Sequence, residues 1–127
     1  MRAGSPLDLA LKAIRSTAAS LTHRDIILLR VDGGLPTDLE LFQQAAAPVP
    51  LRLLGSQHHQ GLAACLNELI EEVLSDERWQ LIARMDADDE SLPGRMKMQR
   101  MFLAEHPQID ILGTACIEVN EHGQHLQ

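Results

Sequence analysis

Three aspartates stand close together in the run Asp86-Ala87-Asp88-Asp89. Asp86 and Asp88 are separated by one residue, so in an extended segment their side chains point the same way. Carboxylates held this close repel one another unless a cation or hydrogen-bond donors compensate their charge. Mg²⁺ and Mn²⁺ prefer oxygen ligands and commonly share their shell between one or two carboxylates and substrate phosphates. The spacing is therefore compatible with a metal-bound phosphate ligand, and equally with a solvated acidic turn.

Two other metal-dependent sites make different demands on the positions around Asp86. A calcium-binding EF-hand loop starting there would need glycine at its sixth position and glutamate at its twelfth, where the chain has Ser91 and Lys97. The sequence excludes that loop. A Mg²⁺-dependent phosphohydrolase of the haloacid dehalogenase type would use Asp86 as its nucleophile, but it would need Thr or Val where Glu90 stands. This second hypothesis remains the weaker alternative.

A further aspartate, Asp32, follows the apolar run 25–31 and precedes Gly33. A short apolar run bounded by polar and turn-forming residues predicts a buried strand. The run 80–85 predicts another strand, which leads directly into Asp86. Ligands of such sheets gather at the carboxyl ends of the strands. Both acidic motifs are therefore expected at the edge of the sheet where ligands bind.

Alternating helices and strands are expected to position these carboxylates. Apolar residues at helical spacing, with capping residues, predict helices over 5–19, 38–46, 61–74 and 93–105. Apolar runs predict strands over 25–31, 51–54, 80–85 and 109–119. Strands that are apolar throughout indicate a sheet covered by helices on both faces. The sequence predicts one α/β domain over residues 1–127.

The composition narrows the class of protein. The chain has 127 residues, and 18 acidic against 11 basic residues give a net charge of -7. Nucleic acid is an unexpected partner, because it is bound through clusters of Lys and Arg that this chain lacks.

Cys65 and Cys116 are predicted to be buried free thiols of a reducing cytosol, and Met96, Met98 and Met101 to pack on a helix face. With no signal pattern or membrane span, we expect a cytoplasmic protein, whose full-length form could still work at a membrane surface.

The segment 82–99 resembles the donor-site signature of family 2 glycosyltransferases. The similarity is closest to the bacterial members that assemble surface polysaccharides and lipopolysaccharide O-antigens. Their Arg-Met-Asp-Ala-Asp-Asp run, proline, arginine and glutamine all occur in register, as Arg84 to Asp89, Pro93, Arg95 and Gln99. Three further stretches are similar to the family's nucleotide-contacting turn, its Gly-Leu…Leu-Asn helix and its later strand pair: 27–37, 61–67, and 109–113 followed by 118–123. Together they cover nearly the whole chain.

The resemblance implies a GT-A-like, Rossmann-related fold with a mostly parallel sheet. It also implies inverting transfer of a sugar from a UDP- or GDP-sugar to a glycan or lipid-linked acceptor. Asp88 would be the principal ligand of Mg²⁺ or Mn²⁺, with Asp86 beside it, and Arg95 would pair with the carboxylates. The residues implied in donor binding are Asp32, Gly33, Arg84, Asp86 and Asp89.

The sequence also departs from the family pattern. Family members begin with an apolar strand, central in the sheet, before the helix that here starts at Ser5, and they continue after Gly123 into the acceptor site and general base. Gln60 stands where the family often has Asn. We therefore expect an incomplete fold, no identifiable catalytic base, and an unpaired sheet edge that favours a homodimer. The chain alone is expected to be catalytically silent, and a remnant that keeps the fold but binds nothing is a further alternative.

Overall fold

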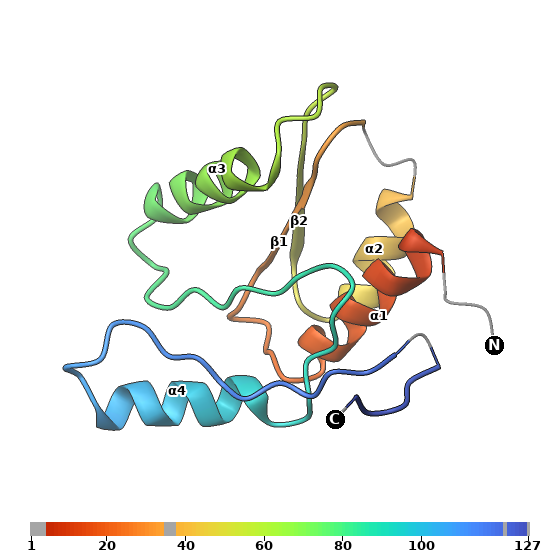
Figure 1. Ribbon diagram of the computed structural model, residues 1–127. Helices are drawn as coiled ribbons and strands as arrows, with labels where there is room; N and C mark the ends of the chain where they lie inside the picture. The colour runs from red at the N-terminus through yellow and green to blue at the C-terminus, as the bar shows by residue number, and fades with distance from the viewer. Residues whose placement is uncertain (1–4, 35–37, 121, 127) are drawn as a thin grey trace.

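The computed structural model describes residues 5–34, 38–120 and 122–126. It is a mixed α/β structure, and its six elements match six of the eight predicted from the sequence (Figure 1). Their bounds are α1 (Pro6–Ala18), β1 (Ile27–Val31), α2 (Leu39–Ala46), β2 (Leu51–Gly55), α3 (Leu62–Leu74) and α4 (Arg95–Glu105).

Helix α1 begins where the sequence predicts, because Ser5 and Asp8 cap it reciprocally. The Ser5 side chain accepts a hydrogen bond from the Asp8 backbone N–H at 3.2 Å, and the Asp8 carboxylate accepts one from the Ser5 backbone N–H at 3.0 Å. Pro6 occupies the first helical position, where a missing N–H costs nothing. The capping groups satisfy backbone donors that the first turn leaves without partners.

The sheet of the described chain consists of two parallel strands, β1 and β2, joined through α2. The register runs from Ile27 opposite Leu51 to Val31 opposite Gly55. Figure 1 shows α1 and α2 on one side of the strands and α3 on the other. The prediction of a parallel sheet with helices on both faces is confirmed to this extent.

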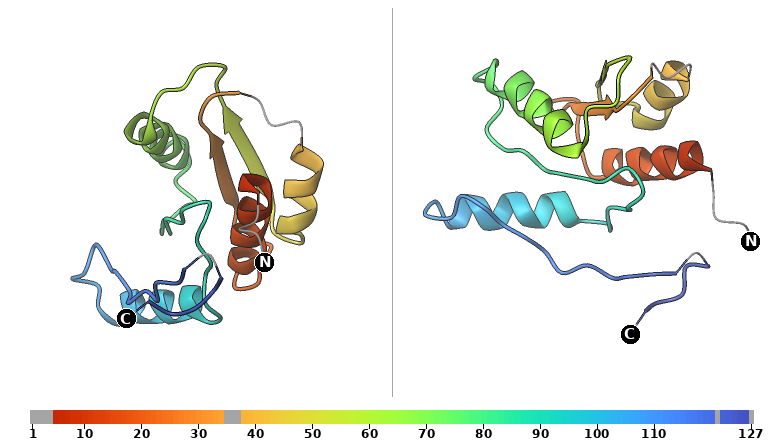
Figure 2. Two further views of the ribbon diagram at one scale, coloured as in Figure 1. Left: turned by 45° about the vertical axis from the view of Figure 1, so that its right-hand side comes forward. Right: turned by 45° about the horizontal axis from the view of Figure 1, so that its top comes forward.

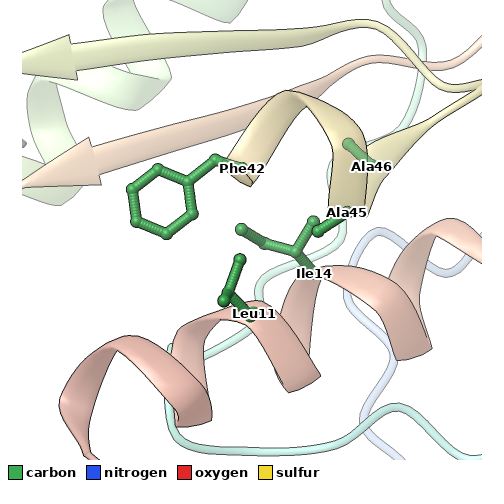
Figure 3. Packing of buried hydrophobic residues seen from close by; sticks show 5 residues of the cluster. All are labelled: Leu11, Ile14, Phe42, Ala45 and Ala46. Atoms are coloured by element: carbon green, nitrogen blue, oxygen red, sulfur yellow. The ribbon is translucent and has the colours of Figure 1, made fainter. Parts of the chain in front are cut away.

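The core lies between α1, α2 and one face of the sheet (Figure 3). Its buried residues are Leu11, Ile14, Phe42, Ala45 and Ala46, with Ile27, Leu29 and Leu51 packed against them. Successive strand residues point to opposite faces. Because Ile27 and Leu29 face this core, the alternate positions of β1, including Arg30, face α3.

The two other predicted strands, 80–85 and 109–119, are wrong. Residues 80–85 have no regular secondary structure, and in 109–119 only Val119 forms a bridge, antiparallel to His125. A strand is stable only where a neighbouring strand accepts its hydrogen bonds, and neither segment has one in the described sheet. Most of their apolar side chains are consequently exposed, and Ile111 is 91% exposed. Both views of Figure 2 show α4 and the described residues after it lying apart from the β1–β2 pair.

The thiols and methionines follow the sequence prediction only in part. Cys65 is a buried free thiol, as predicted, but Cys116 is exposed because the strand predicted around it does not form. Met96 is buried, whereas Met98 and Met101 are 72% and 53% exposed. The predicted packing of those two is wrong, because no other part of the described chain covers their side of α4. In the part of the chain that the structure describes, no helix has the length and apolarity needed to cross a membrane.

Candidate functional site

Asp32 directly follows β1 and holds the amino end of α3. Its Oδ1 accepts the backbone N–H of Gln60 at 2.7 Å, and its Oδ2 accepts that of Gly61 at 2.9 Å. Gly61 is the residue that precedes α3, and because glycine has no side chain it cannot itself cap the helix. A carboxylate here satisfies backbone donors and is favoured by the positive end of the helix dipole. The sequence correctly predicts Asp32 at a strand end, but not that it caps a helix.

Two side chains complete the surroundings of Asp32. His59 Nδ1 lies 2.7 Å from Oδ2, and the Cys65 thiol also donates to the carboxylate. The Gln60 N–H is the largest cause that lowers the pKa of Asp32; partial burial opposes it, and Gly61, Cys65 and His59 reinforce it. Burial and the neighbouring Asp32 raise the pKa of Cys65, which keeps it a neutral thiol donor. The carboxylate is therefore ionised and densely hydrogen-bonded at neutral pH.

His59 is the donor to Asp32 that a ligand can most easily displace. Its side chain is 79% exposed, whereas the Asp32 side chain is 21% exposed. A carboxylate offers about four acceptor positions, so a ligand that reaches Asp32 must share with or displace one of its present donors. Gly33 lies against the same loop with φ +83°, and a Cβ there would stand 3.5 Å from His59 Cβ. A side chain at Gly33 would be strained in this conformation.

Arg30 is a part of this site that the sequence interpretation misses. Its side chain is 2% exposed, and its Nε donates to Glu68 Oε2 on α3 at 2.6 Å. One Nη donates to Gln60 Oε1 at 3.0 Å, and the other donates to the Val31 carbonyl. The signal that could have found it is a charged residue inside an otherwise aliphatic strand.

The Asp86–Asp89 run forms a turn, which corrects the extended geometry expected from its spacing. The Asp89 backbone N–H donates to the Asp86 carbonyl at 3.3 Å, and Asp86, Asp88 and Asp89 are all exposed. Since no strand forms before it, the turn is not at the carboxyl end of a strand. The chain curls here because no neighbouring backbone holds it extended.

Two arginines contact this turn in different ways. Arg84 Nη2 lies 2.9 Å and 3.2 Å from the two carboxylate oxygens of Asp86, so the predicted link between Arg84 and Asp86 is present. Arg95 instead donates to the Arg84 carbonyl and to Met85 Sδ, each at 3.2 Å. It thus fastens the backbone that leads into the turn, and it makes no ion pair with any carboxylate among the residues that the structure describes.

The chain after the turn is attached to α1. The backbone N–H of Ser91 donates to Ser16 Oγ at 3.0 Å, and Lys12 forms an ion pair with Glu90. Ser91 is 6% exposed and Ser16 is half-buried, so this hydrogen bond is partly shielded from solvent. It fixes the far end of the acidic turn against α1, while the carboxylates of Asp88 and Asp89 face solvent.

The two acidic motifs do not form one cluster with three protein ligands. Across residues 5–34, 38–120 and 122–126, no three His, Cys, Asp or Glu side chains are grouped so that they could hold a metal ion. In Figure 1 the carboxyl end of β1 is at the top, beside a grey trace, and the segment between α3 and α4 crosses lower down. The strand expected to bring Asp86 to the edge that carries Asp32 is absent from the sheet.

Acid is expected to lower the stability of the protein below about pH 4, and Asp32→Asn should remove part of this loss. The folded-state pKa of Asp32 is lowered. Its contribution to stability is therefore fully present above the unfolded pKa and is lost as the pH falls through the folded pKa. Urea denaturation at pH values from about 7 to about 3 measures the effect. Asp110→Asn, at an exposed position, is the matched control; equal acid sensitivity of the two variants would contradict the assignment.

Comparison with known proteins gives relatives that are named glycosyltransferases. The chain is 30% identical over 114 residues to the amylovoran biosynthesis glycosyltransferase AmsE of Erwinia amylovora, covering 89% of this chain and 41% of AmsE. It is 30% identical over 112 residues to an uncharacterized glycosyltransferase of Haemophilus influenzae, covering 87% and 40%. It is 36% identical over 50 residues to the O-antigen biosynthesis glycosyltransferase WbnJ of Escherichia coli, covering 39% and 19%.

These comparisons bear on the alternatives in the sequence interpretation. No family model and no solved structure matches the chain. None of the three relatives is named a phosphohydrolase, so the hypothesis of an Asp86 nucleophile gains no support. The chain spans about two fifths of the length of the first two relatives. Over nearly all of its own length, it is similar to glycosyltransferases, one of them named for amylovoran biosynthesis.

Proposed function

We propose that this chain is the nucleotide-sugar-binding part of a glycosyltransferase of polysaccharide assembly. The observation that carries the proposal is similarity across 89% of the chain to a glycosyltransferase of amylovoran biosynthesis. The proposed donor is a UDP- or GDP-sugar, and the proposed reaction is inverting transfer to a glycan or lipid-linked acceptor. None of the described residues is assigned as the general base.

The nucleoside end of the donor is assigned to Asp32 and Gly33. Asp32 lies at the carboxyl end of β1, where ligands of parallel sheets bind. An ionised carboxylate accepts the ring N–H of a base or the O–H of a ribose. Gly33 has no Cβ and φ +83°, so the backbone beside Asp32 is open to a close approach.

The diphosphate end is assigned to the acidic turn, together with Mg²⁺ or Mn²⁺. Mg²⁺ is usually bound through one or two carboxylates plus substrate phosphates and water, so exposed Asp88 and Asp86 fit an ion that arrives with its diphosphate. When bound, the ion neutralises negative charge on the departing nucleoside diphosphate. Arg84 holds the Asp86 carboxylate in place. Asp89 is proposed to contact the sugar or ribose.

UDP or GDP with Mn²⁺ is expected to stabilise the folded protein, by about 2.7 kcal/mol when the ligand is at a hundred times its Kd. A ligand that binds only the folded state must raise its stability. Asp88→Asn is expected to weaken metal-dependent nucleotide binding at least about tenfold, because it removes a charged metal ligand. Thermal denaturation and calorimetric titration, each with and without Mn²⁺, measure both effects.

The matched control for this experiment is Asp110→Asn, which makes the same change of charge at an exposed position outside the turn. It should retain metal-dependent stabilisation. Equal weakening by the two substitutions would show a general effect of net charge and remove the assignment of Asp88. No stabilisation of the unsubstituted protein by either nucleotide with Mn²⁺ would contradict the proposed function.

A further inference from the structure

Arg30 is a buried charge that joins three segments of the chain. The other four residues of β1 are aliphatic, and the Arg30 side chain is 2% exposed. A buried charge is tolerated only when it is paired and hydrogen-bonded. The guanidinium satisfies this requirement with Val31, Glu68 and Gln60, which lie on β1, on α3 and in the loop between β2 and α3. Its planar guanidinium carries five N–H donors in a fixed fork, so it can bind three acceptors that lie in different directions around one plane.

Gln60 transmits this contact to Asp32. Its side-chain oxygen accepts from Arg30 at 3.0 Å, and its backbone N–H donates to Asp32 Oδ1 at 2.7 Å. The next backbone N–H, that of Gly61, donates to Oδ2 at 2.9 Å. Arg30 lies in β1, and Asp32 directly follows the strand two residues later. The bonds from Arg30 to Gln60 and from Gln60 to Asp32 close a ring with the backbone of residues 30–32, and Glu68 and Gly61 connect this ring to α3.

We propose that Arg30 is a positioning residue of the nucleotide site, which acts by fixing Gln60 so that two backbone N–H groups set the direction of the Asp32 carboxylate. The inference rests on the proposed function, since that assigns the nucleoside to Asp32. The two backbone donors occupy one acceptor position on each oxygen, and the exposed His59 stands at another. The base or ribose of the donor takes the position of His59 on a carboxylate whose orientation is already set.

The proposal is tested by Arg30→Met and Gln60→Ala, with Arg52→Met as the matched control. Arg52 also links a strand to α3, through Glu72, but its side chain is 58% exposed and it does not contact Asp32 or Gln60. Gln60→Ala removes the bond to Arg30 while keeping the charge of Arg30 and the backbone N–H of residue 60. If Arg30→Met does not fold, Gln60→Ala alone tests whether the bond between Arg30 and Gln60 orients Asp32.

Two measurements on the ligand-free protein report on the ring of hydrogen bonds. Both Arg30→Met and Gln60→Ala should speed amide hydrogen exchange at residues 60 and 61 by about tenfold, the equivalent of one lost hydrogen bond. Both should raise the pKa of Asp32 in a carbon-13 NMR titration, and the double variant should add little to Arg30→Met. Arg52→Met should change neither quantity. A pKa rise in Arg30→Met with no effect of Gln60→Ala would show action through charge alone and overturn the proposal.

A third measurement separates this inference from the proposed function. Arg30→Met should bind UDP or GDP about tenfold more weakly than Arg52→Met, because the carboxylate is less well oriented. Unchanged nucleotide affinity, together with faster amide exchange, would overturn the positioning role. Absence of nucleotide binding in the unsubstituted protein would instead contradict the proposed function, and the exchange and NMR results would still decide whether Arg30 orients Asp32.

Discussion

Phe42→Ala is expected to lower the free energy of unfolding by about 3–5 kcal/mol. Phe42 is 5% exposed and lies in the cluster between α1, α2 and the sheet, which also contains Leu11 and Ile14. Truncation removes buried apolar surface and leaves a cavity that the surrounding side chains fill only in part. Since small domains have total stabilities of about 5–15 kcal/mol, a loss of this size is a large share of the whole. Urea denaturation followed by circular dichroism measures the loss.

Phe102→Ala is the matched control for this prediction, because it makes the same truncation on α4. Phe102 is 37% exposed and stacks on the ring of His106 with centroids 4.1 Å apart. Its removal should cost about 1 kcal/mol or less, the typical value of one aromatic pair at a surface. Comparable losses in the two variants would contradict a core confined to α1, α2 and the sheet.

Gly61→Ala is expected to cost about 1–3 kcal/mol through backbone strain alone. Gly61 has φ +87° and ψ 161°, a region that residues with a Cβ rarely occupy. No atom lies within 4 Å of the position that a Cβ would take, so crowding contributes nothing. The variant should also shift the backbone N–H that donates to Asp32. Urea denaturation measures the cost, and the NMR titration of Asp32 reports the change at the site.

Gly113→Ala provides the control for Gly61→Ala. A Cβ at Gly113 likewise meets no atom within 4 Å, and its φ lies outside the left-handed region. The substitution should change stability by no more than about 0.5 kcal/mol. If the two variants lost equal stability, the strained conformation at Gly61 would not be the cause.

The elements that the sequence predicts correctly are those specified by local signals. Helix α1 follows from the cap at Ser5 and Asp8, and β1 from an aliphatic run ending at Asp32. The runs 80–85 and 109–119 carry the same apolar signal, but a strand also needs a partner for its backbone. That partner is remote in sequence, and in the described structure β1 pairs with β2 alone. The residues of a short apolar run do not specify which remote strand, if any, will pair with it.

In the candidate site, too, features that depend on the local sequence are predictable, and features that depend on residues remote in sequence are not. The position of Asp32 at a strand end is predictable because it depends on the strand that precedes it. Its helix-capping bonds, and the link through Arg30 and Gln60, depend on how a loop about thirty residues later in the chain folds back. The turn at Asp86 differs from the extended prediction because the strand that should hold it straight is missing. The metal, nucleotide and homodimer predictions stay predictions.

The arrangement of the core has a consequence for the order of folding during synthesis. All the residues of the cluster between α1, α2 and the sheet lie between Leu7 and Leu51. Chains fold from the N-terminus as they leave the ribosome, and contacts close in sequence form fastest. The α1–β1–α2–β2 unit can therefore assemble while α4 and the segment after it are still being translated. The acidic turn is then added to a scaffold that already exists, through the contact of Ser91 with Ser16 on α1.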